Sequence, residues 1–346
     1  MKPITVLDGV PPLPGDANAW LDELPGPIAI RVHGRDTSKT RLVSGMLHGN
    51  EPSGLRAIFH ALRSRERFAT DTIFFVGAVE AAREPPRHTY RMLPGRRDLN
   101  RCFRPPFGDT DGRIAEALLA LVRATPLEAV VDLHNNSGHN PVYGVGIADD
   151  AGRLGLASLF TERYVISPLS LGSLHEAFPR SLPVVTMECG RAGDPHADEA
   201  AVAGLTRFLR TRELPRVDAS SGRMHLLRSP VRVRVCPGVS LAYGERRDAD
   251  LTLDADVDRH NFRRQPAGTR IGWLREGAPW PFEACDAAGC DRAHDLFERR
   301  GDAIVTSRAI VPIMMTTSPA IAHDDCLFYV VEEVDAPGVT GASRNR

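Results

Sequence analysis

The chain has 346 residues, of which 42% are apolar and 25% charged, an ordinary composition for a globular protein. Its formal net charge of −1 excludes the basic excess that attracts nucleic acids or anionic membranes, so we expect neither as a partner. No run reaches the roughly 18 apolar residues of a membrane span, and the first residues lack the apolar core of a secretory signal. We therefore expect a cytoplasmic protein with reduced thiols.

Residues 1–215 alternate between strand-like and helix-like patterns. Short β-branched runs bounded by Gly, Pro or Asp predict strands at residues 28–33, 40–47, 72–79, 129–133 and 182–188. Apolar residues at helical spacing predict helices at residues 52–65, 111–123 and 198–212. Because near-continuous apolar strands are typical of sheets covered on both faces, we expect a three-layer α/β/α domain with a mixed sheet.

The pattern changes after about residue 216, where long helical stripes disappear. Strand-like runs follow at residues 224–228, 231–235, 303–306 and 326–332. This change predicts a smaller β-rich domain over residues 216–336, with the boundary near Leu214 and Pro215. The last residues, 337–346, have the composition of a flexible tail.

His48 and Glu51 are three residues apart, where the predicted strand ending at residue 47 meets the next predicted helix. Across a strand-to-helix turn, this spacing allows both side chains to converge on one metal ion. Gly49 permits a tight turn and Pro52 suits a first helical turn. The alternative is a helix-capping Glu beside a structural His.

His134 follows the apolar run 129–133 and precedes turn-forming residues. Asp132 lies two positions earlier, so both side chains project from the same face of a strand. Asp132 is therefore a candidate to orient a metal-binding imidazole. Together, His48, Glu51 and His134 can hold zinc and leave one coordination position for water, which indicates a hydrolase.

Glu188 ends a third apolar run, and Gly190 lies just beyond it. Burying a carboxylate is costly unless it is paired or functional. We therefore interpret Glu188 as the general base that takes a proton from water and passes it to the leaving nitrogen. A structural ion pair is the alternative for this residue.

The stretch from Arg91 to Phe103 lies between predicted strands and carries several arginines. Asn100 and Arg101 are candidates to bind a substrate carboxylate, because guanidinium pairs with carboxylates in bidentate geometry. A further arginine, Arg91 by preference, is a candidate to stabilise the oxyanion of a tetrahedral intermediate. A solvated basic loop is the competing interpretation.

Four segments together resemble the succinylglutamate desuccinylase/aspartoacylase family, a branch of the zinc carboxypeptidase superfamily. The matching segments occur in the family's order at residues 48–54, 98–103, 132–135 and 187–190. The resemblance covers roughly residues 28–210. It implies a carboxypeptidase-like fold, a zinc ion and an N-acyl amino acid as substrate, and it is compatible with a homodimer.

The resemblance also implies a role for each candidate residue. His48, Glu51 and His134 correspond to the ligands of one zinc ion, Glu188 to the catalytic base, and Asn100 and Arg101 to the carboxylate-binding pair. Arg91 is the preferred oxyanion arginine, with Arg96 and Arg97 as rivals. Arg180 is the nearest counterpart of an arginine that holds a second carboxylate. Residues 189–195 depart from what is expected of true aspartoacylases, and there Arg191 either adds a specificity contact or pairs with Asp194.

The leading hypothesis is a zinc-dependent amidohydrolase that removes the acyl group from a small N-acyl amino acid bearing a carboxylate. One alternative is a metallocarboxypeptidase that acts on short peptides or peptidoglycan fragments. An alternative of another class is a catalytically inactive zinc-binding module. The short separation between the second and third ligands favours the deacylase over the peptidase.

Overall fold

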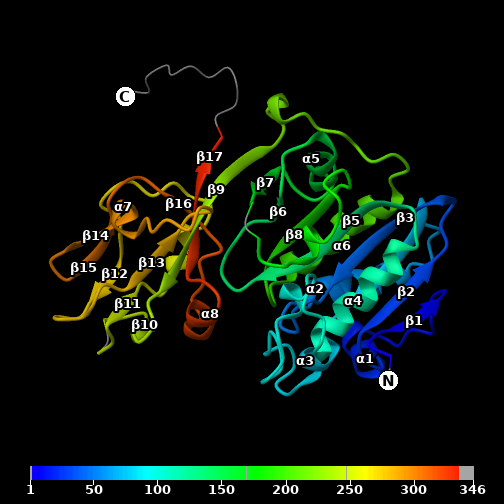
Figure 1. Ribbon diagram of the computed structural model, residues 1–346, viewed down its shortest axis with the longest axis horizontal. Coiled ribbons are helices and arrows are strands. Elements are labelled where there is room, and N and C mark those ends of the chain that lie inside the picture. The colour runs from blue at the N-terminus through cyan, green and yellow to red at the C-terminus, as the bar shows by residue number, and fades with distance from the viewer. Residues whose placement is uncertain (1, 169, 247, 335–346) are drawn as a thin grey trace. The chain divides into compact units, whose positions relative to one another are not determined.

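The computed structural model describes residues 2–168, 170–246 and 248–334 (Figure 1). The chain divides into two compact units. The first comprises residues 1–135, 142–165 and 169–224, and the second comprises residues 136–141, 166–168 and 225–346. The predicted flexible tail, 337–346, lies outside the described residues.

The first unit combines a mixed sheet with helices. Its strands are β1 (Thr5–Asp8), β2 (Ile28–Val32), β3 (Asp36–Gly45), β4 (Thr70–Val76), β5 (Leu127–Asn136), β6 (Tyr143–Gly146), β7 (Arg163–Ile166) and β8 (Val184–Arg191). Its α-helices are α1 (Ala17–Glu23), α2 (Ser53–Arg63), α3 (Val79–Arg83), α4 (Thr110–Arg123), α5 (Ala151–Ser158) and α6 (Pro195–Arg210). Its short 3₁₀ helices are η1 (Leu99–Arg101), η2 (Leu174–Glu176) and η3 (Ala219–Ser221).

The strands of this unit follow the order β1-β2-β4-β3-β5-β8-β6-β7 across the sheet. β3 pairs in parallel with both β4 and β5, whereas β2–β4 and β6–β8 are antiparallel pairs. The five strands predicted in this half of the chain correspond to β2, β3, β4, β5 and β8. The expected mixed α/β architecture is therefore confirmed.

Three element boundaries differ from the predicted ones. α6 begins at Pro195 rather than at residue 198, because Asp194 caps the helix by accepting a hydrogen bond from the N–H of His196. Val79 begins α3 instead of ending a strand. β5 continues to Asn136, so the turn predicted after His134 starts later.

The helices attach to the sheet through apolar side chains. In α4, Ile114 and Leu118 belong to one buried cluster with Leu42 of β3 and Val130 of β5. α2 and α6 pack against each other. Burial of these apolar surfaces stabilises the strands whose ends carry the candidate site.

The second unit is rich in β-structure. Its strands are β9 (His225–Val235), β10 (Leu241–Tyr243), β11 (Leu251–Leu253), β12 (Arg270–Leu274), β13 (Phe282–Cys285), β14 (Phe297–Arg300), β15 (Ala303–Thr306), β16 (Val311–Ile313) and β17 (Phe328–Glu333). Its helices are η4 (Val257–His260), α7 (Ala293–Leu296) and α8 (Pro319–Asp324). One sheet has the order β10-β11-β12-β15-β14, and β9 pairs with both β13 and β17. Within the described parts of the chain, no helix is long and apolar enough to cross a membrane.

Candidate active site

Three neighbouring strands of the first unit bring the candidate residues together. β3 pairs in parallel with β5, and β8 is the next strand beyond β5. His48 and Glu51 lie in the turn between β3 and α2, His134 lies in β5, and Glu188 lies in β8. The carboxyl ends of neighbouring strands in α/β sheets commonly carry ligand sites.

Glu51 lies between two imidazoles. Its Oε1 is 2.7 Å from Nδ1 of His48, and its Oε2 is 2.7 Å from Nδ1 of His134. The ring centroids of the two histidines are 4.9 Å apart. One ligand atom from each of these three buried residues lies within 4.8 Å of the others, a geometry that can hold a metal ion.

The turn that carries His48 and Glu51 fits closely against the segment that follows α3. A Cβ on Gly49 would lie 2.6 Å from the N of Ala82 and 2.7 Å from the O of Tyr90, so only glycine fits here. The N–H of Gly49 donates to the carbonyl of Arg91 at 2.9 Å. Main-chain contacts of Gly49 therefore fix this turn, in addition to the contact between the side chains of His48 and Glu51.

Each candidate histidine has a second carboxylate on its other ring nitrogen. Asp98 Oδ1 is 3.0 Å from Nε2 of His48, and Asp132 Oδ2 is 2.8 Å from Nε2 of His134. Asp132 is completely buried. Carboxylates in this position orient metal-binding imidazoles and raise their basicity, and the Asp132 contact agrees with the sequence expectation.

The electrostatics of this cluster favour positive charge at its centre. Burial by itself would raise the pKa of Glu51, but the two imidazoles outweigh burial and hold it well below the usual range of a carboxyl. Burial likewise opposes protonation of His134, yet Asp132 and Glu51 raise its pKa well above the usual value. A divalent cation would satisfy the same carboxylates.

Glu188 is buried, with 7% of its surface exposed, and pairs in register with Tyr143 of β6. Burial raises its pKa from 4.5 to about 7, while the charges of His134 and His48 act in the opposite direction. A carboxyl that titrates near neutrality can both accept and donate a proton at physiological pH.

The three rival arginines have different partners. Arg91 donates to Oδ2 of Asp98 through Nε at 3.0 Å and Nη2 at 2.9 Å, and its Nη1 lies 3.7 Å from Oε1 of Glu51. Arg96 binds both oxygens of Asp111 at 2.8 Å. Arg97 instead donates to an exposed carboxylate in the loop before α4. Of the three, Arg91 is the one in contact with the histidine–glutamate cluster.

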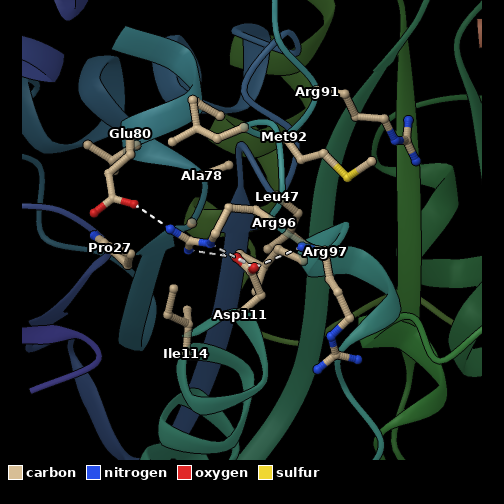
Figure 2. A pocket seen from close by; sticks show the side chains of 15 residues that line it. Pro27, Leu47, Ala78, Glu80, Arg91, Met92, Arg96, Arg97, Asp111 and Ile114 are labelled. Atoms are coloured by element: carbon tan, nitrogen blue, oxygen red, sulfur yellow. Dashed lines mark hydrogen bonds and ion pairs between the residues drawn. The ribbon is translucent and has the colours of Figure 1, made fainter. Parts of the chain in front are cut away.

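Figure 2 shows a pocket lined by residues of the loop that carries these arginines and by residues of α3 and α4. Arg96 lies inside it between Asp111 and Glu80, whereas Arg91 and Arg97 point away from it. The distance from Nη1 of Arg96 to Oε2 of Glu80 is 3.0 Å. Arg96 thus joins α3 to α4.

A comparison with protein families matches half of the chain to one family. Residues 37–209 match the family model described as the succinylglutamate desuccinylase/aspartoacylase catalytic domain, a span that contains all four candidate residues. The chain belongs to this family. No curated protein sequence matches it significantly.

Solved structures with the family's fold resemble this family member over most of its length. A succinylglutamate desuccinylase/aspartoacylase from Rhodobacter sphaeroides is 14% identical, with 89% of this chain and 88% of that chain covered and a TM-score of 0.59. The succinylglutamate desuccinylase from Chromobacterium violaceum is 14% identical, with coverage of 91% and 90% and a TM-score of 0.57. Murine aminoacylase 3 is 15% identical, with coverage of 87% and 97% and a TM-score of 0.53. At these identities the likeness establishes the fold.

Asn100 and Arg101 lie in η1, next to the cluster. Asn100 Nδ2 is 3.4 Å from Nε2 of His134, and its Oδ1 accepts from the N–H of Leu174 at 3.0 Å. Arg101 donates to the carbonyl of Asn100 at 3.1 Å. Burial raises the pKa of Asp98, but His48, Arg91 and Arg101 hold it well below its usual range.

Arg180 and Arg191 are both exposed. Arg180 is exposed in the segment before β8, four residues ahead of the strand's first residue. Glu188 lies near the opposite end of that strand, and successive strand residues advance by about 3.3 Å. Arg191 is exposed at the end of β8.

Two further residues of the site were not assigned a role from the sequence. Asp98 belongs to the recognised segment 98–103, but its contact with His48 depends on how the loop folds back. Asn135 follows His134 directly and contacts both of the other site segments. The available signals were the position of Asp98 in the recognised segment and the place of Asn135 directly after His134.

Proposed function

We propose that this chain is a zinc-dependent amidohydrolase that cleaves the amide bond of a small N-acyl amino acid bearing a carboxylate. The observation that carries the proposal is the pairing of a convergent His48–Glu51–His134 cluster with Glu188, a buried carboxyl whose pKa is about 7. The family provides independent support, because its name describes desuccinylase and aspartoacylase chemistry.

The donor set fits zinc. Two imidazole nitrogens and a carboxylate match a common catalytic zinc site, in which the remaining position is open to water. The carboxylates of Asp98 and Asp132 support the two imidazoles, as second partners of zinc-bound histidines commonly do. When bound, zinc would supply Lewis acidity for the amide carbonyl and lower the pKa of water.

The protein side chains would then divide the remaining chemistry. Glu188 accepts the proton of the attacking water and delivers it to the leaving nitrogen. Arg91, held by Asp98 close to Glu51, donates to the oxygen that becomes negative in the tetrahedral intermediate. Asn100 and Arg101, beside His134, bind the carboxylate of the substrate.

Other sequence expectations stay predictions. They are the three-layer arrangement, the domain boundary near residue 215, the homodimer and the cytoplasmic location. The proposed contact of Arg180 with a second carboxylate gains no support from its exposed position before β8. A specificity contact by Arg191 is likewise untested.

The experiment combines metal analysis with a substrate panel. Purified protein loaded with zinc is expected to bind one zinc per chain and to hydrolyse N-acyl amino acids with higher kcat/KM than dipeptides. A preference for dipeptides would favour a metallocarboxypeptidase. Stoichiometric zinc without hydrolysis of any amide would indicate an inactive binding module.

The Glu188→Gln variant tests the base. It should retain zinc and lose about 10²–10⁴-fold in kcat, because the proton transfer is removed while the metal ligands remain. Glu80→Gln, which changes a carboxylate on the far side of the 91–98 loop, is the matched control and should keep its kcat. Activity of Glu188→Gln within tenfold of wild type would contradict the proposal.

A further inference from the structure

Asn135 uses every polar atom of its side chain to join two other site segments. Its Oδ1 accepts from the N–H of Ser53 at 3.0 Å, and its Nδ2 donates to the Oγ of Ser53 at 2.9 Å and the carbonyl of Gly190 at 3.2 Å. Its main-chain N–H donates to Oε2 of Glu51 at 3.1 Å. Asn135 itself is buried.

These partners lie beside the candidate catalytic residues. Ser53 is two residues after Glu51, Gly190 is two residues after Glu188, and Asn135 adjoins His134. A single side chain therefore links the three segments that hold the proposed metal ligands and the proposed base. Side chains alternate along a strand, so the amide of Asn135 projects from the face opposite His134. There it contacts Ser53 and Gly190 rather than the proposed metal.

The chemistry of the contacts requires a carboxamide. The N–H of Ser53 can only donate and the carbonyl of Gly190 can only accept, so Oδ1 must face the former and Nδ2 the latter. An aspartate of the same shape would present an acceptor to the carbonyl of Gly190. An alanine would leave both main-chain groups without this partner.

The contact with Gly190 lies near the end of β8. Gly190 has a φ of 114°, a backbone conformation that residues with a side chain rarely adopt. Gly190 lies two residues beyond Glu188, near the end of β8. The hydrogen bond from Asn135 holds the carbonyl of this residue, and so constrains the backbone of the strand end that carries Glu188.

Ser53, the partner of Asn135, is itself held by a carboxylate of α6. The Oγ of Ser53 donates to Oδ1 of Asp198 at 2.6 Å, and Arg56 donates to the other oxygen of the same carboxylate. Asp198 lies in the first turn of α6, and Ser53 begins α2. The beginnings of both helices are therefore connected through Ser53 to the amide of Asn135.

We propose that Asn135 is a positioning residue that holds the Glu188-bearing end of β8 in register with the proposed metal ligands. This inference rests on the proposed function, because it concerns how Glu188 is placed for its proton transfer. Asn135 does not act on the substrate itself. Its effect reaches the reaction through the backbone of β8 at Gly190.

The test is a double-mutant cycle between Asn135→Ala and Glu188→Gln, measured with zinc-loaded protein. Asn135→Ala is expected to lower kcat about 10–100-fold, as loss of an outer hydrogen-bond partner commonly does. KM should change less than about threefold, and zinc should stay at one per chain because the main-chain contact to Glu51 survives. In the Glu188→Gln background, the same substitution should lower kcat further by less than about threefold.

The outcomes separate this inference from the proposed function. If the loss of kcat in the double variant equals the product of the losses in Asn135→Ala and Glu188→Gln, Asn135 acts independently of Glu188. This result would overturn the inference. If Glu188→Gln retains activity, the proposed base is wrong and the inference falls with it. Asn135→Asp, which keeps the shape of the side chain, should show the same non-additive loss even if the alanine variant folds poorly.

Asn261→Ala is the matched control for simple destabilisation. Asn261 is also buried, and its side chain likewise contacts main-chain groups, accepting from the N–H of Met315 at 2.8 Å and donating to the carbonyls of Met315 at 3.1 Å and His139 at 3.0 Å. Its substitution should lower Tm by a similar amount and leave kcat within about threefold. An equal loss of kcat in this variant would show that Asn135→Ala acts through general stability and would overturn the inference.

Discussion

Arg91 and Arg96 lie in one loop, and each binds an aspartate, but the two ion pairs connect to different parts of the molecule. Both arginine side chains are 25% exposed, and both contacts fall between 2.8 and 3.0 Å. Arg91 pairs with Asp98, which also contacts His48. Arg96 pairs with Asp111, in the first turn of α4. The comparison teaches that the third partner, rather than the pair itself, separates a functional contact from a structural one.

The difference extends to the charge around each guanidinium. The hydrogen bonds that Arg96 donates to Asp111, together with those to Glu80, raise the pKa of Arg96 well above its usual value, so two carboxylates pair with one arginine (Figure 2). On the other side, Asp98 is shared between Arg91 and His48. Arg96 therefore stabilises helix packing, whereas Arg91 stays part of the cluster that surrounds Glu51.

The strongest test of this contrast is Arg91→Ala. We expect kcat to fall about 10²–10³-fold, the usual effect of removing one donor to a developing oxyanion. Zinc content should stay unchanged, because Arg91 is not a proposed ligand. Steady-state kinetics and metal analysis measure both quantities. A loss confined to KM would assign Arg91 to substrate binding and contradict the oxyanion role.

The second test uses the pH dependence of stability in the metal-free protein. The pKa of Glu188 rises from 4.5 to about 7 on folding, so the folded state favours the protonated carboxyl. Its favourable contribution is complete below pH 4.5 and is lost as the pH rises through 7. Glu188→Gln removes this titration, so the variant should gain roughly 3 kcal/mol relative to wild type between these pH values.

Urea unfolding of wild type and Glu188→Gln in the presence of a chelator, at pH 4, 6 and 8, measures this difference. The Arg96–Asp111 side of the loop provides the control. Arg96→Met should change stability equally at pH 6 and 8, because aspartate and arginine side chains ordinarily titrate outside that range. A pH-independent difference between wild type and Glu188→Gln would refute the raised pKa of Glu188.

The smallest expected effect concerns Arg96 itself. Arg96→Met leaves the buried carboxylate of Asp111 with the N–H of Arg97 at 3.0 Å, so we expect a loss of about 2 kcal/mol in the free energy of unfolding. The value of kcat should stay within about threefold of wild type. Thermal unfolding and kinetics check these two outcomes.

Arg97→Met is the companion control. Arg97 and Asp109 form a surface pair, with exposed fractions of 36% and 47%, and such pairs contribute little. Its loss should change stability by less than about 0.5 kcal/mol. If Arg96→Met reduced kcat as much as Arg91→Ala, the contrast between the two sides of the loop would be wrong.

The sequence was sufficient to predict which strands carry the site. The apolar runs ending near His48, His134 and Glu188 correspond to β3, β5 and β8, because buried parallel strands have a strong compositional signature. The short strands β10 to β14 of the second unit escaped prediction. These strands have three to five residues, which leaves little of a period-2 pattern to detect, although β15, with four residues, was predicted from its apolar run.

The sequence also could not show which of the three arginines contacts the site. Arg91, Arg96 and Arg97 occur within seven residues, and periodicity does not distinguish them in an irregular loop. Their roles depend on Asp98, Asp109 and Asp111, whose positions follow from the start of α4 and the path of the loop. Long-range hydrogen bonding, such as that of Asn135 with Gly190, is likewise a property of the assembled sheet.

The parallel pairing of β3 and β5 has a consequence for the order in which the protein matures. Glu51 and His134 are 83 residues apart, and parallel strands can pair only after the intervening crossover has been made. A nascent chain that has not yet emerged beyond β5 therefore lacks one of the three proposed ligands. Acquisition of zinc would follow sheet assembly, and the ion would stabilise the finished domain rather than guide its early folding.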